Sequence, residues 1–119
     1  MAMTASCKLI NNTGSMILFT SITQVNDDAT WDVNPPAGTQ IQDGSSTLIA
    51  MGNSSVFFAP QGVGFSAQFV CQSNFQPGGV SLDDPAVGEH SFSLGNTARF
   101  NYQITNPQGN DYQVVISLK

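Results

Sequence analysis

The sequence predicts an all-β protein, a single-domain antiparallel β-sandwich. Three observations lead to this prediction. Apolar and polar residues alternate with a period of two along much of the chain. Clusters of Gly, Pro, Asn and Asp separate the alternating segments, and no window has a convincing helical period. The length of 119 residues suits one core, so we expect residues 1–5 to be an N-terminal tail or cloning remnant and residues 6–119 to form the sandwich.

The two closing segments show the alternation most clearly. In TARFNYQIT and in YQVVISL, every second residue is apolar while the residues between them are mostly polar. Such alternation is typical of half-buried antiparallel strands. Short strands at this spacing favour a sandwich or barrel of eight or nine strands. We expect the further strands near residues 6–10, 15–24, 39–42, 46–51, 54–59, 65–72 and 90–94.

The inward positions of these strands predict the core. Cys7 and Cys71 share the parity of their apolar neighbours, so we interpret them as two buried free thiols, with a disulfide between them as the alternative. A free thiol in such a place behaves as a small hydrophobe. The expected core residues are Leu9, Ile17, Phe19, Leu48, Phe65, Phe69, Phe100, Tyr102, Val114 and Ile116.

One break interrupts the apolar run CKLINNTGSMILFTSIT, the segment N-N-T-G at residues 11–14. Because alternating strands lie on both sides, we interpret it as a tight hairpin corner. Asn11 and Asn53 each begin a formal N-glycosylation sequon, but the N-terminus shows no secretory signal, so both sequons are interpreted as incidental. Further turns are expected at 34–38, 43–44, 52–53, 60–64, 76–79, 95–96 and 106–111.

The charge balance excludes several classes of partner. Three basic residues face eight acidic ones, which gives a net charge of -5, and the cations do not cluster. Nucleic-acid binding through phosphates is therefore not expected, and attraction to anionic membranes is disfavoured. No apolar run has the length of a transmembrane helix. The N-terminus shows no signal peptide, so we expect either a mature form or a leaderless protein that is cytoplasmic or secreted by a non-classical route.

No residue set carries the signature of an enzyme or a metal site. The single histidine, His90, has no accompanying nucleophile motif, and one histidine does not supply enough ligands for a histidine-based zinc site. The pairs Asp27, Asp28 and Asp83, Asp84 match no calcium-loop spacing and are interpreted as solvated loop acids. No nucleotide-binding glycine motif is present. We therefore expect a non-enzymatic protein without cofactor or metal.

Aromatic residues beside the predicted turns are the remaining functional signal. Trp31 lies in DDATWDVNPP, Phe75 in QSNFQPGG, and Phe57 with Phe58 in SSVFFAP. Aromatic side chains near strand ends stack on sugar faces in lectins or lie at the headgroup boundary in membrane-binding proteins. A structural role for Trp31, which would cover one end of the core, is the competing interpretation.

Four segments together resemble the aegerolysin family and its bacterial insecticidal members: CKLINNTGSMILF, ATWDVNPPAGTQIQDGSST, SSVFFAPQGVGFSAQFV and NYQITNPQGNDYQVVISL. The resemblance implies a small acidic β-sandwich that binds membrane sphingolipids or their headgroups. Several members act with a larger partner protein to form pores. The resemblance thus implies a membrane-recognising toxin or defence component, and Trp31 is the aromatic residue that it carries over.

The candidate binding residues are Trp31, Asp28, Asp32, Asn34 and Phe75, with a membrane-lipid headgroup or a glycan as the ligand. Two alternatives stay open. A carbohydrate-binding lectin would use the same loops, and a defence protein acting on another protein would bind neither lipid nor sugar. The sequence leaves the oligomeric state open.

Overall fold

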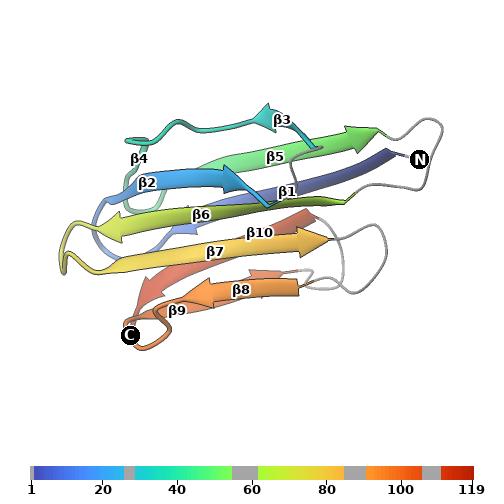
Figure 1. Ribbon diagram of the computed structural model, residues 1–119. Coiled ribbons are helices and arrows are strands. Elements are labelled where there is room, and N and C mark those ends of the chain that lie inside the picture. The colour runs from blue at the N-terminus through green and yellow to red at the C-terminus, as the bar shows by residue number, and fades with distance from the viewer. Residues whose placement is uncertain (1, 26–28, 55–61, 85–90, 106–110) are drawn as a thin grey trace.

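The computed structural model describes residues 2–25, 29–54, 62–84, 91–105 and 111–119. Within these residues, ten strands form two five-stranded sheets that lie face to face (Figure 1). Sheet A has the order β3-β5-β1-β10-β9 and sheet B the order β4-β2-β6-β7-β8. The strands are β1 (Ala2–Asn11), β2 (Ile17–Gln24), β3 (Thr30–Val33), β4 (Gln40–Ile41), β5 (Ser46–Ser54), β6 (Val63–Cys71), β7 (Pro77–Asp84), β8 (Ser91–Gly95), β9 (Phe100–Thr105) and β10 (Asp111–Leu118).

The predicted all-β sandwich is confirmed, with one addition to its topology. The described strand pairs are antiparallel except that β1 runs parallel to β10, with Cys7 opposite Tyr112 and Leu9 opposite Val114. The first and last strands of the chain thus lie side by side in the middle of sheet A. β1 also begins at Ala2, and Ala5 is buried in the core, so the strand includes residues expected to form a tail.

The core lies between the sheets and is built by strand parity. In β6, every second side chain from Phe65 to Cys71 points inward and is fully buried. The rings of Phe69 and Phe100 meet edge to face with their centroids 5.3 Å apart, an arrangement that aromatic pairs prefer. Both cysteines are buried free thiols, which confirms that interpretation.

Two members of the expected core are placed differently. Leu48 was expected inside but is 42% exposed. Its neighbour Ile49 pairs with Cys7 and points inward, so the alternation of β5 turns Leu48 outward beside Lys8. Tyr102 is only partly buried and packs against the rim of the core.

Strand β7 shows where the turn prediction at 76–79 was wrong. Pro77, Gly78 and Gly79 begin β7, and the turn lies just before them. A Cβ atom at Gly78 would collide with the ring of Phe69, so the glycine makes room for this core aromatic side chain. The glycines therefore serve packing within a strand rather than a turn. Strands β3 and β7 were not predicted.

Candidate functional site

The N-N-T-G corner is organised around the buried side chain of Asn11. Its amide nitrogen donates to the backbone carbonyls of Ser15 and Ile41, both at 2.7 Å. Its amide oxygen accepts hydrogen bonds from the backbone N–H of Thr13 at 3.0 Å and from the Thr13 hydroxyl at 2.7 Å. Gly14 then turns the chain with a φ of +86°. Because Asn11 is fully buried, the first sequon is no glycan acceptor in the folded protein.

The turn between β6 and β7 rests on this corner. The Gln72 backbone N–H donates to the Met16 carbonyl at 2.9 Å, and the Ser73 N–H donates to the Ser15 hydroxyl at 3.2 Å. Within the turn, the Phe75 N–H donates to the Cys71 carbonyl at 2.9 Å. Residues 11–16 and 72–76 thus form one end of the sandwich, which we call the corner end.

Phe75 projects from the corner end in an unusual backbone conformation. Its side chain is 80% exposed, more than any other large apolar residue that the structure describes. Its φ of +54° lies in the left-handed region, which is a genuine outlier for a bulky residue. Such strain costs about 1–3 kcal/mol and persists only where surrounding contacts impose it. The turn therefore holds an aromatic ring in solvent at an energetic cost.

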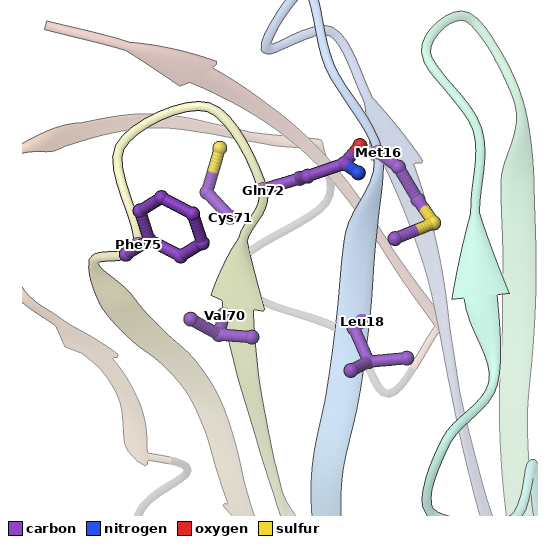
Figure 2. A pocket seen from close by; sticks show the side chains of 6 residues that line it. All are labelled: Met16, Leu18, Val70, Cys71, Gln72 and Phe75. Carbon is purple, nitrogen blue, oxygen red and sulfur yellow. The ribbon is translucent and has the colours of Figure 1, made fainter.

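An apolar hollow of about 150 Å³ lies beside this ring on the outer face of sheet B (Figure 2). Leu18 of β2 and Val70 of β6 are cross-strand partners that both point outward. Figure 2 shows Phe75 next to Val70, with Leu18 and Met16 across on the neighbouring strand. The lining residues are Met16, Leu18, Val70, Cys71, Gln72 and Phe75.

The thiol of Cys71 lies at the inner side of this hollow among hydroxyl groups. Burial raises the pKa of Cys71, but hydrogen bonds from the hydroxyls of Ser15, Ser73 and Thr13 and from the Ser73 backbone outweigh it and lower the pKa. The sulfur is 3.3 Å from the Ser15 oxygen and 3.4 Å from the Ser73 oxygen. Cys7, in the apolar core, has its pKa raised to about 12 by burial. The two thiols thus have opposite electrostatic environments.

The structure does not bring the five predicted binding residues together. Trp31 is partly buried in edge strand β3, with its ring centroid 6.2 Å from that of Phe65, so it covers an edge of the core. Asp32 and Asn34 are exposed beside it, while Asp28 lies outside the described residues, as does His90. Phe65 and Cys71 are six residues apart on β6, which spans about 20 Å. Phe75 therefore lies far along the sandwich from Trp31.

Sequence reasoning missed the apolar lining of the hollow. Met16, Leu18 and Val70 were assigned to strands without regard to their outward parity. Leu18 could have indicated an apolar surface, because it lies between the inward residues Ile17 and Phe19. An apolar side chain at such an outward position does not contribute to the core. One strand alone does not reveal that Val70 lies opposite.

The described part of the chain contains no helix with the length and apolarity to cross a membrane. In the same residues, no three His, Cys, Asp or Glu side chains gather in a way that could hold a metal ion.

Comparisons with known proteins identify the fold. No protein-family model and no curated protein sequence matches the chain. The crystal structure of IP-1A from Alcaligenes faecalis matches with a TM-score of 0.71 at 12% identity, over 98% of this chain and 91% of that one. The RahU protein, solved in complex with a Tris molecule, matches with a TM-score of 0.65 at 18% identity, over 97% and 93%. At these identities the two matches show that this chain shares its fold with IP-1A and RahU.

Proposed function

We propose that this protein is a non-enzymatic membrane-lipid-recognising protein of the toxin or defence type, which docks on a bilayer with its corner end. The resemblance of four sequence segments to the aegerolysin family, whose members bind sphingolipids, supports this proposal, and the β-sandwich fold shared with IP-1A and RahU is compatible with it. The larger pore-forming partner that the resemblance implies would meet the protein after docking.

The exposed ring of Phe75 carries the proposal. A left-handed backbone position is served at lower cost by glycine or asparagine than by phenylalanine. Here an aromatic residue is held there, 80% exposed, beside an apolar hollow. Aromatic side chains gain free energy at the boundary between headgroups and acyl chains, where an apolar ring leaves water. Contact with lipid would remove the exposed Phe75 ring from water and would explain why the turn holds it in a strained conformation.

Phe75 is better suited than Trp31 to be the main anchor. Trp31 is partly buried and packs against the core beside Phe65, whereas Phe75 is 80% exposed to solvent. The exposed polar residues Asp32 and Asn34 beside Trp31 remain candidates for a second contact. The net charge of -5 disfavours anionic lipids, so we expect neutral or zwitterionic headgroups and weak dependence on salt.

The test is sedimentation with vesicles of phosphatidylcholine and sphingomyelin. Phe75→Gly removes the ring and relieves the left-handed strain, so the variant should be at least as stable as the wild type. Loss of an aromatic anchor costs about 2 kcal/mol, or roughly thirtyfold in affinity. Leu48→Ala is the matched control, because it removes an exposed apolar side chain from the outer face of sheet A.

The outcomes separate the alternatives. Equal sedimentation of Phe75→Gly and the wild type would remove Phe75 from the site. A selective loss in folded Trp31→Ala would return the anchor to Trp31. No vesicle binding by the wild type would refute membrane recognition and bring the lectin alternative forward.

A further inference from the structure

A row of hydroxyl groups crosses the outer face of sheet B. Thr23 of β2 lies opposite Ser66 of β6, Ser66 lies opposite Ser81 of β7, and Ser81 lies opposite Ser93 of β8. Their strand neighbours point into the core, so all four side chains face outward. Neighbouring strands are about 4.8 Å apart, so this hydroxyl row extends for about 14 Å.

Part of the hydroxyl row is already ordered by hydrogen bonds. The Ser81 hydroxyl donates to the Ser66 oxygen at 2.8 Å, and the Gln68 amide donates to the same oxygen at 3.0 Å. Ser66 accepts both bonds and still has its own proton to donate. Gln68 lies over Gly79, where a Cβ atom would come within 2.7 Å of the Gln68 amide oxygen. A ligand on this row would meet polar groups that lose little further freedom on binding.

The hydroxyl row and the apolar hollow lie on the same outer face of sheet B. Ser66, Gln68 and Val70 are successive outward positions of β6, so about 13 Å separates the row from the hollow. With the corner end against a bilayer, the outer face of sheet B rises from the lipid surface, and a headgroup that projects from the bilayer would run along it (Figure 1).

The charges beside the hydroxyl row disfavour a headgroup with net negative charge. The next outward residue of β7 is Asp83, whose carboxylate repels an anionic headgroup but accepts hydrogen bonds from hydroxyl groups. Lys8 points outward from β1 on the opposite sheet. Among the described residues of this face, the polar groups offered include hydroxyls, side-chain amides and a carboxylate, which complement a neutral polyol.

We propose that the ligand is a neutral glycolipid, whose sugar headgroup lies along the hydroxyl row while its apolar part meets the hollow and Phe75. The inference rests on the proposed membrane function and names the headgroup chemistry.

The test compares vesicles of phosphatidylcholine alone with vesicles that also contain lactosylceramide. The wild type should bind the second kind more tightly. The double variant Ser66→Ala/Ser81→Ala should lose this gain by about tenfold, since it removes the hydrogen bonds of two hydroxyls, while its binding to plain vesicles stays unchanged. Ser117→Ala is the control, because it removes a half-buried outward serine from sheet A.

Equal binding of the wild type to both vesicles would overturn the glycolipid inference and leave the membrane proposal standing. Binding to neither vesicle would refute the membrane proposal. A titration with free lactose then tests the sugar contact without a membrane. The backbone amide NMR signals of Ser66, Ser81 and Ser93 are monitored as lactose is added. Shifts at these amides would support it, and their absence would overturn it.

Discussion

Asn11 offers the sharpest test of how the corner is stabilised. Asn11→Asp keeps the shape of the side chain but replaces the amide nitrogen by a second oxygen. The carbonyls of Ser15 and Ile41, each 2.7 Å from that nitrogen, then lose this donor, although the Ser15 carbonyl keeps a hydrogen bond from the Thr13 hydroxyl at 2.8 Å. A buried acceptor left unsatisfied costs about 1–3 kcal/mol, so we expect a loss of about 2 kcal/mol. This is a large fraction of an ordinary domain stability of about 5–15 kcal/mol.

The loss should depend on pH with a defined sign. Carbonyl oxygens facing the new carboxyl disfavour its charged form, so they raise its pKa in the folded protein. The folded state then binds the proton more tightly than the unfolded state does. Unfolding free energy should therefore be highest below the unfolded-state pKa of about 4 and should fall as the pH rises through the raised folded-state pKa.

The assay is urea unfolding, followed by the fluorescence of the single tryptophan at acidic and neutral pH. Asn12→Asp is the matched control, because it makes the same chemical change on the exposed neighbour and should alter stability by less than about 0.5 kcal/mol. Equal unfolding midpoints for the two variants at neutral pH would show that the Asn11 hydrogen bonds do not stabilise the corner.

Four further predictions concern packing and the thiols. Phe100→Ala should cost about 3–5 kcal/mol in unfolding free energy through the cavity left behind, while exposed Leu48→Ala should be nearly neutral; similar losses would argue against the burial pattern. Gly78→Ala should cost about 1–3 kcal/mol because its methyl group collides with a core ring, and a neutral effect would contradict that contact. A thiol reagent should label Cys71 before Cys7, since the pKa of Cys7 is raised to about 12 and the hydroxyls lower that of Cys71. Because the pKa of Cys7 is raised from 9.0 to about 12 in the folded protein, the unfolding free energy of the wild type should fall as the pH rises through this range, and that of Cys7→Ala should fall less. The same pH dependence in both proteins would exclude Cys7 as its cause.

Strand parity explains why the fold was predictable and where the prediction stopped. Alternation fixes which side chains share a face, and this placed nine of the ten expected core residues in the core or packed against it. The prediction that Leu48 is buried was wrong. Its segment TLIAM is apolar at consecutive positions, so the alternating set that faces inward is not known until the partner strand is known. The turn predicted at 76–79 was wrong because the sequence does not distinguish a glycine that makes room for an aromatic ring from a glycine that forms a turn.

The candidate site was less predictable because it depends on pairings between distant segments. Phe75 was singled out from its turn, but its exposure and left-handed backbone follow from contacts with the corner 60 residues earlier. Leu18 and Val70 form a surface only because β2 and β6 are neighbours. The hydroxyl row needs the registers of four strands at once, and no local pattern encodes these registers.

The corner also connects the stability of the fold to the shape of the site. Asn11 holds the Ser15 carbonyl, and the Ser15 hydroxyl accepts a hydrogen bond from the backbone of Ser73. The next residue, Met16, holds the turn through its carbonyl and lines the hollow with its side chain. Loosening Asn11 therefore shifts the walls of the hollow and the support of Phe75 without touching the surface. Phe75→Gly does the reverse, since it removes the exposed ring and leaves the hydrogen bonds of the corner intact, so the two variants separate a loss of architecture from a loss of contact.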